Sequence, residues 1–166
     1  GKETGYQKGS YVNLKESGKR VILVGDTHAR YENIISIVEA NREDLENGSA
    51  VIVFLGDMVH SESNYSEMET SLATMQYYMW LKIAYPTGVY MLAGNHDIGI
   101  RMRKAGVLQG ELYYGGMQER YGQGFVSEYR KTILETFALL AEGDEWIATH
   151  AGPAKGEKLA DTVNKI

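Results

Sequence analysis

Short apolar runs separated by longer mixed segments dominate the pattern of this chain. Three runs, at residues 20–24, 50–55 and 89–93, are rich in apolar and β-branched residues and are each followed by a glycine, which predicts buried strands. Residues 31–40 have apolar positions at helical spacing. A capping box at Ser66 and Glu69 predicts a second helix, which must end before Pro86. The order strand, helix, strand, helix, strand predicts a parallel sheet with right-handed crossovers.

The pattern is less regular in the last part of the chain. Residues 99–124 contain seven of the 19 glycines, which predicts a long irregular connection. Residues 126–141 predict a helix closed by Gly143, and residues 145–148 predict a fourth short strand. No repeat or linker divides the 166 residues, so a single domain is expected.

Composition narrows the classes of function. The net charge of −5 argues against nucleic acid as the main partner, because phosphate contacts are made chiefly by Lys and Arg. The absence of cysteine excludes a disulfide framework, a thiolate metal site and a cysteine nucleophile. No apolar run approaches the roughly 20 residues that a transmembrane helix needs. A soluble protein is therefore expected, and the cytoplasm is favoured as its compartment.

A polar cluster follows each predicted strand. The four clusters are Gly25-Asp26-Thr27-His28, Gly56-Asp57-Met58-Val59-His60, Gly94-Asn95-His96-Asp97 and Thr149-His150-Ala151-Gly152. Together they contain all four histidines of the chain. Because ligands of open α/β sheets bind at the carboxyl ends of the strands, we expect these side chains to converge.

The residue types in these clusters favour metal chemistry. Carboxylate and imidazole donors without sulfur suit Mn, Fe or Zn. A carboxylate between two such ions makes a clamp that activates water and stabilises the oxygens of an in-line phosphoryl displacement. Taken singly, a Gly-Asp after a strand is more typical of an ordinary turn, and His96 alone could be a helix cap or a hydrogen-bonded core residue. The occurrence of all four in order favours a metal centre.

These motifs resemble those of the calcineurin-like metallophosphoesterase superfamily, and within it the Ser/Thr phosphoprotein phosphatases and their bacterial relatives. The family pattern is GDxH, GDxxDRG, GNH followed by an acid, and HAG or HGG at a strand end, and the similarity covers residues 20–152. The resemblance implies an α/β fold, a β-sandwich flanked by helices in four layers (α/β/β/α). Residues 1–166 would be a single metallophosphoesterase domain truncated at its C-terminus. They would contain its N-terminal part with the parallel core, and most of the second sheet would follow residue 166.

The resemblance also implies how the metal ions are held. Asp26 and His28 would bind the first ion, Asp57 would bridge both ions, and Asn95 and His150 would bind the second. Asn95 would in addition contact the phosphate. The implied cofactors are two divalent or mixed-valence ions of Mn, Fe or Zn, and the implied nucleophile is a hydroxide that bridges them.

By the same resemblance, His96 would be the general acid that protonates the leaving oxygen, a role that suits an imidazole near neutral pH. In the family, an Asp of the second motif orients this histidine and the following Arg binds phosphate, but here His60 and Ser61 stand at those positions. A histidine cannot act as an anionic orienter, and a serine cannot make a bidentate guanidinium contact. Asp97 could supply part of the negative charge that the family's Asp provides. The catalytic candidates are therefore His96, Asp97 and His60.

Other features bear on the completeness of the site. Arg101 and Arg103 could supply the phosphate contacts that Ser61 cannot make, or they could be solvated loop residues. The glycine-rich stretch 106–124, with its three tyrosines, could form a substrate-facing rim or an ordinary surface connection. The family's last metal ligand is a histidine in a GH motif, and none follows His150. We expect that ligand beyond Ile166; otherwise the second metal site is incomplete.

The implied function is metal-dependent hydrolysis of phosphate esters, with a phosphomonoesterase or protein Ser/Thr phosphatase favoured. The substrate would be a phosphoprotein or a small phosphoester. A phosphodiesterase or a dinucleotide polyphosphate hydrolase of the same superfamily is an alternative. A degenerate member that binds phosphate or a partner without turnover is an alternative from another class, and the unusual second motif and the missing last ligand support it.

Overall fold

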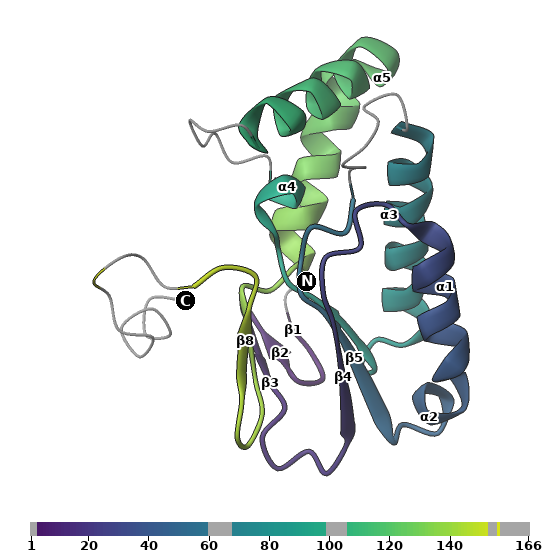
Figure 1. Ribbon diagram of the computed structural model, residues 1–166, viewed down its shortest axis with the longest axis vertical. Coiled ribbons are helices and arrows are strands. Elements are labelled where there is room, and N and C mark those ends of the chain that lie inside the picture. The colour runs from purple at the N-terminus through teal and green to yellow at the C-terminus, as the bar shows by residue number, and fades with distance from the viewer. Residues whose placement is uncertain (1–2, 60–67, 99–105, 153–155, 157–166) are drawn as a thin grey trace.

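A computed structural model describes residues 3–59, 68–98, 106–152 and 156 of the chain. Three parallel strands, β4 (Arg20–Val24), β5 (Ala50–Phe54) and β6 (Val89–Met91), form one sheet in that order. Helix α1 (Tyr31–Ala40) and the short α2 (Arg42–Glu46) lie between β4 and β5, and α3 (Met68–Ala84) precedes β6 (Figure 1). The predicted parallel β-α-β-α-β core is confirmed. Ser66, which was predicted to cap α3, lies outside the described residues.

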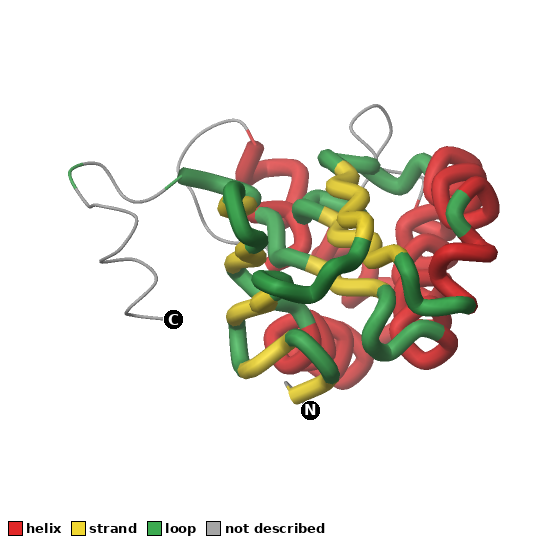
Figure 2. The backbone as a smooth tube through the Cα atoms, turned by 90° about the horizontal axis from the view of Figure 1, so that it is seen from below, coloured by secondary structure: helices red, strands yellow, loops and turns green. Residues whose placement is uncertain are grey.

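Helices cover one face of the parallel sheet. Ile52 and Phe54 of β5 pack there against Ile34 of α1 and Tyr78 of α3, in a cluster that also takes in residues from both parts of α5 (Gly106–Thr136). In Figure 1, α1 and α3 lie side by side along this face, and Figure 2 shows them as a layer beside the strands. All five side chains of β5 are buried, because β5 is the central strand and both of its faces are covered.

A second sheet covers the other face. Its strands are β1 (Glu3–Thr4), β2 (Gln7–Lys8), β3 (Tyr11–Asn13), β7 (Leu140–Glu142) and β8 (Ile147–Thr149), in that order across the sheet. Val12 and Ala141 from this sheet pack against Val51 and Val53 of β5. The two sheets form a sandwich with the helices outside one of them. The described residues therefore make three of the four layers expected for the fold.

The origin of this second sheet differs from the expectation. Most of it was expected to follow residue 166, yet five of its strands come from segments before β4 and after α5. The first three strands were not predicted, because runs of two or three residues are too short to show an alternating pattern. A bridge between Leu92 and Ala138 links the chain after β6 to the segment that leads into β7.

The glycine-rich region is helical where the structure describes it, which corrects the predicted irregular connection. Helix α5 includes residues 106–124 and is bent at Gly122, whose φ of 84° and ψ of 161° are not helical. Buried side chains such as Met117 hold the helix on the core, so packing outweighs the low helix propensity of glycine. The helix predicted over residues 126–141 was also too long, since α5 ends at Thr136 and Leu140 belongs to β7.

Candidate metal centre

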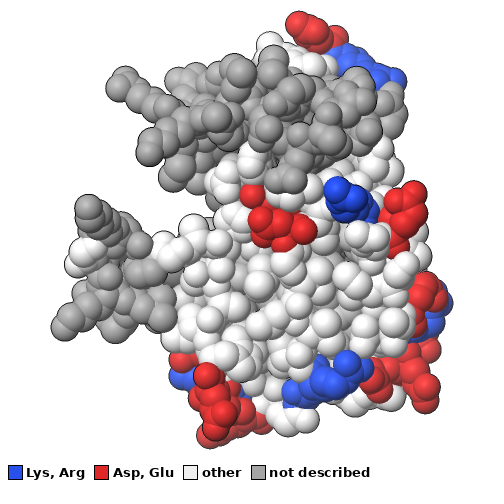
Figure 3. All heavy atoms as spheres, viewed as in Figure 1, with Lys and Arg blue, Asp and Glu red and all other residues white. Residues whose placement is uncertain are grey.

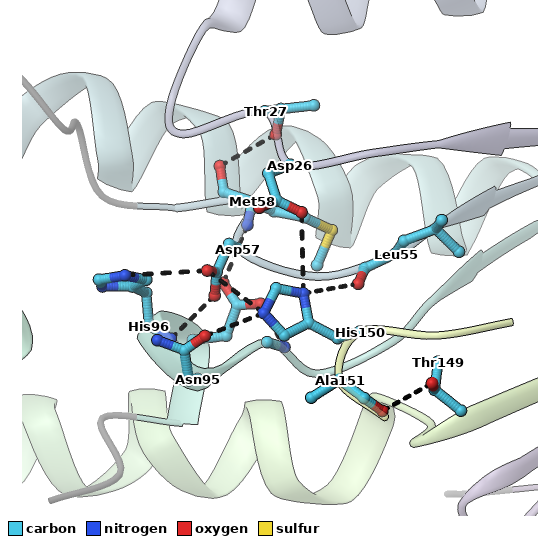
Figure 4. Close-up of polar contacts among 12 residues, drawn as sticks. Asp26, Thr27, Leu55, Asp57, Met58, Asn95, His96, Thr149, His150 and Ala151 are labelled. Atoms are coloured by element: carbon cyan, nitrogen blue, oxygen red, sulfur yellow. Dashed lines mark hydrogen bonds and ion pairs between the residues drawn. The ribbon is translucent and has the colours of Figure 1, made fainter. Parts of the chain in front are cut away.

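The chain segments that follow four strands meet at one place (Figure 4). The predicted ligands there are Asp26 and His28 after β4, Asp57 after β5, Asn95 in α4 (Asn95–Ile98) after β6, and His150 after β8. The first three segments lie at the carboxyl edge of the parallel sheet, as expected. The fourth comes from the other sheet, where β8 runs antiparallel to β7, so the sandwich as a whole is needed to bring His150 in.

Asp26, His28 and Asp57 form a group with the geometry of a metal site. One ligand atom from each lies within 4.8 Å of the others. Nε2 of His28 lies 3.9 Å from Oδ2 of Asp26. Ligand atoms around one Zn-like ion lie about 2 Å from it and hence up to about 4 Å apart, so small side-chain adjustments suffice for these three to hold one ion.

His150 adjoins the same central carboxylate, and Asn95 contacts His150. Nε2 of His150 lies 3.3 Å from Oδ2 of Asp57 and 2.9 Å from Oδ1 of Asn95. Its Nδ1 lies 2.9 Å from the carbonyl oxygen of Leu55. An N–H at Nδ1 donates to that carbonyl and leaves Nε2 free to bind a metal, which is the usual arrangement of metal-binding histidines. Asp57 thus lies next to both groups of donors.

The electrostatics of this cluster reflect the close approach of Asp57 and His150. Burial alone would raise the pKa of Asp57, but hydrogen bonds from the His150 ring and from the backbone N–H of His96 outweigh burial and lower it. The hydrogen bond to Asp57 raises the pKa of His150 to about 9, against an opposing effect of burial. In the metal-free chain, a proton on His150 therefore occupies the place where a cation would neutralise the carboxylates.

His96 lies beside the same carboxylate. Its backbone N–H donates to Oδ1 of Asp57 over 2.8 Å, and its ring Nε2 lies 3.8 Å from Oδ2 of Asp57. The His96 ring meets the His28 ring edge to face, with centroids 5.6 Å apart. The side chain is 11% exposed and stands next to the candidate ligands. It therefore lies beside the candidate ligands, and its role as the acid stays a prediction.

The backbone of the site is held in unusual conformations. His28, Ala29 and Asp57 have positive φ angles of 42°, 58° and 47°, which side-chain-bearing residues rarely adopt. The N–H groups of His28 and Ala29 donate to the carbonyls of Asp57 and Met58, so the first two loops brace each other. Such strained residues cluster at functional sites, where the surrounding structure enforces them.

The glycines ahead of the ligands differ in what they do. Gly56 has a φ of 104°, and a Cβ there would lie 2.7 Å from both Gly94 N and His150 Nδ1. A Cβ on Gly94 would lie 2.2 Å from Asp57 N and Asp57 Oδ1. At Gly25 a Cβ would meet nothing within 4 Å. Glycine is therefore needed for close approach at the second and third motifs, but not at the first.

Asp97 is completely buried and faces backbone groups of two loops. Its Oδ1 accepts from the N–H groups of Met58 at 3.1 Å and Val59 at 3.4 Å, and its Oδ2 accepts from Gly94 N–H at 2.9 Å. Burial raises its pKa to about 6, against the lowering effect of these hydrogen bonds. Its contacts fasten the second loop to the third. A direct part in catalysis stays a prediction, and these contacts favour a positioning role.

Three predicted site residues lie outside the described residues: His60, Arg101 and Arg103. Ser61 lies outside them too. The catalytic role of His60 and the phosphate contacts of Arg101 and Arg103 stay predictions.

Polar contacts that the motifs did not predict support the loops from behind. Thr27 Oγ1 lies 3.3 Å from the Met58 carbonyl oxygen, to which it donates, and 3.2 Å from the Tyr78 hydroxyl, and both side chains are buried. Tyr114 donates its O–H to the backbone carbonyl of Asp97 at 2.5 Å. Tyr114 was considered for a substrate-facing rim, but it is buried. The motifs carry no signal for such contacts, because the tyrosines lie on distant helices.

On the face shown in Figure 3, charged side chains gather mainly around the margin, while acidic and basic side chains also lie nearer the middle. None of the described helices combines the length and the apolar character needed to cross a bilayer.

Comparison with known proteins gives one family. Residues 19–165 match the sequence model described as Metallophos, calcineurin-like phosphoesterase. The chain is 29% identical over 159 residues to a protein phosphatase 2A catalytic subunit from Dictyostelium discoideum, a match that covers 95% of this chain and 46% of that protein. It is 27% identical over 146 residues to "Serine/threonine-protein phosphatase T" of Trypanosoma brucei brucei, over 86% of this chain and 27% of that protein.

A solved structure has a similar fold. It is a protein serine/threonine phosphatase from Saccharomyces cerevisiae, described as similar to human phosphatase PP5, and it matches with a TM-score of 0.59 and 16% identity. The match covers 91% of this chain and 44% of that one. The chain thus spans about half or less of the length of these relatives.

Proposed function

We propose, because the chain belongs to the calcineurin-like phosphoesterase family, that its strand-end cluster is the two-metal centre of a phosphoric ester hydrolase. Within that class we favour a phosphomonoesterase that acts on phosphoserine or phosphothreonine in proteins. The curated relatives described above carry the name of protein phosphatases, one of them of a serine/threonine phosphatase, which supports this choice of substrate.

One observation carries the proposal. Oxygen and nitrogen donors from three other chain segments lie around the buried carboxylate of Asp57. Asp26 and His28 adjoin it as one group, and Asn95 and His150 as another. Buried carboxylates normally require compensation by cations or hydrogen bonds, and a pair of divalent ions would supply it here.

The donor set fits the ions that the family uses. Asp26, His28 and Asp57 would hold the first ion, and Asp57, Asn95 and His150 would hold the second. Bound there, divalent ions would activate water and neutralise charge on the phosphate oxygens. Mn, Fe and Zn all suit these donors, so the identity of the ions is open. A further histidine ligand from beyond Ile166 stays a prediction.

The chain's own residues would complete the reaction. His96 would hold a proton for the leaving oxygen, and Asn95 would orient the phosphate. The buried Asp97 would keep both of them in register with Asp57, through its contacts with Met58 and Gly94. This division of roles requires that loss of the His96 ring slows hydrolysis without removing the ions.

The test is hydrolysis by the purified full-length protein and its His96→Asn variant with Mn²⁺. The variant keeps the backbone N–H that donates to Asp57, so only the ring is lost. We expect turnover of p-nitrophenyl phosphate to fall by roughly 10²–10⁴-fold, with the metal content unchanged. Unchanged turnover would remove His96 from the acid role.

The same assay separates the alternative functions. Faster hydrolysis of bis-p-nitrophenyl phosphate or diadenosine tetraphosphate than of the monoester would favour a phosphodiesterase or a dinucleotide polyphosphate hydrolase. Phosphate binding without turnover of any of the three would favour the degenerate alternative, which the residues at positions 60 and 61 support.

A further inference from the structure

We infer that Tyr114 is a positioning residue for the proposed site: it holds the α4 turn, which carries Asn95 and His96, in register with Asp57. The effect of Tyr114 on catalysis rests on the proposed function, but its role in positioning the α4 turn does not. Tyr114 is 9% exposed and lies on α5, outside all four strand-end motifs.

The contact joins the α4 turn to α5 directly. The Tyr114 hydroxyl donates to the backbone carbonyl of Asp97 at 2.5 Å. In the same turn, the Asp97 carboxylate accepts from Gly94 N–H and from Met58 N–H, and the His96 N–H donates to Asp57. The turn is thus fastened to the second loop through the Asp97 carboxylate and the His96 N–H, and to α5 through the Asp97 carbonyl. The hydroxyl of Tyr114 supplies the second of these attachments.

The bend in α5 holds the Tyr114 ring in place. In a straight helix, Tyr114 and Tyr129 would lie about 22 Å apart along the axis. Their ring centroids are only 6.2 Å apart, edge to face, and the guanidinium carbon of Arg130 lies 5.2 Å from the centre of the Tyr114 ring. The non-helical backbone at Gly122 makes this possible, because it folds the first part of α5 back on the second. Tyr129 and Arg130, in the later half of the same helix, therefore hold the Tyr114 ring in place.

The consequence for the site is geometric. Without the hydroxyl, the Asp97 carbonyl loses one attachment while the carboxylate contacts remain. The turn would then open more often, and His96 and Asn95 would spend less time next to Asp57. A misplacement of about 1 Å in a reacting group is enough to lower a rate by as much as about 10²-fold.

The first experiment measures amide hydrogen exchange in the metal-free chain, with Tyr114→Phe and a control, Tyr11→Phe. Tyr11 also donates a hydroxyl, to Glu142 in the second sheet, so the control loses the same kind of bond in another part of the fold. We expect exchange of the His96 N–H to become about tenfold faster in Tyr114→Phe and to stay unchanged in Tyr11→Phe. Equal exchange of this amide in both variants would overturn the inference.

A second pair of variants covers the case in which Tyr114→Phe does not fold. Gly122→Ala strains the bend, since φ there is +84°, while Gly124→Ala lies two residues away without a positive φ, and an added Cβ meets nothing within 4 Å at either position. We expect faster exchange of the His96 amide in Gly122→Ala only. Identical exchange in the two alanine variants would contradict the role of the bend.

Activity supplies a separate readout. In the full-length protein, Tyr114→Phe should lower kcat by roughly 3- to 30-fold with KM and metal content unchanged, while Tyr11→Phe should change none of them. A kcat that matches the control would reject a role in positioning the reacting groups. If no form of the protein hydrolyses phosphate esters, the proposed function fails, and the exchange measurement still decides the inference about Tyr114.

Discussion

A methyl group at Gly94 should disrupt the site from within. The Cβ of an alanine there would lie 2.2 Å from the backbone N and from Oδ1 of Asp57. Normal non-bonded contacts are about 3.5 Å or longer, so Asp57 or the third loop must move by about 1 Å. Overpacking of this kind costs about 1–3 kcal/mol of stability. The displaced atoms include the carboxylate that the proposed ions share.

Gly25→Ala is the matched control for Gly94→Ala. Gly25 also precedes a predicted ligand, but its Cβ would meet nothing within 4 Å and its φ is not positive. Alanine there should leave the folded site intact and stabilise the chain by about 0.4–1 kcal/mol, through the lower entropy of the unfolded state.

Urea unfolding and Mn²⁺ titration of the two variants test this reasoning. We expect Gly94→Ala to unfold at lower urea concentration and to bind Mn²⁺ at least tenfold more weakly, consistent with a misplaced ligand. Gly25→Ala should match or exceed the parent in both measurements. Equal behaviour of the two variants would refute the close approach of the second and third loops on which the geometry of the site depends.

Two further predictions concern the support and the charge of the site. Thr27→Val should lower the free energy of unfolding in urea by about 1–3 kcal/mol, because the buried Tyr78 hydroxyl loses its partner. The double variant Thr27→Val/Tyr78→Phe should lose less stability than the sum of the two single variants. Strict additivity would argue against the contact. In the metal-free chain, the pKa of His150 is raised to about 9. The protonated His150 therefore stabilises the fold fully below about pH 6.5, and this stabilisation, at most about 3 kcal/mol, is lost as the pH rises through 9. Chemical unfolding at several pH values should show this decline in the parent and not in His150→Gln, and a decline that persists in the variant would assign the effect to another group.

The parallel core was predictable from the sequence because its signals are local. Residues 21–24 of β4 and all of β5 are continuous apolar runs, and the apolar residues of α1 have a clear helical spacing. The region of α5 was not predictable in this way. Its glycines favour an irregular chain, but Tyr114 and Met117 are buried against the core, and this packing depends on residues far away in the sequence.

The sequence predicted which residues meet at the site, but not how closely they pack. Each motif follows a strand, so the convergence of Asp26, His28, Asp57 and Asn95 could be expected from the order of elements alone. The sequence did not reveal which glycine is essential, because that depends on how closely two loops approach. It also did not reveal the burial of Asp97, since a carboxylate after GNH could equally face the substrate.

Anomalous diffraction from crystals grown with Mn²⁺ tests the central claim most directly. We expect two adjacent peaks that share the Asp57 carboxylate, one beside Asp26 and His28 and the other beside Asn95 and His150. Both peaks should vanish in crystals of folded Asp57→Asn. A well-ordered map with no peak at Asp57, or with ions held elsewhere, would contradict the assignment of this cluster as a two-metal centre.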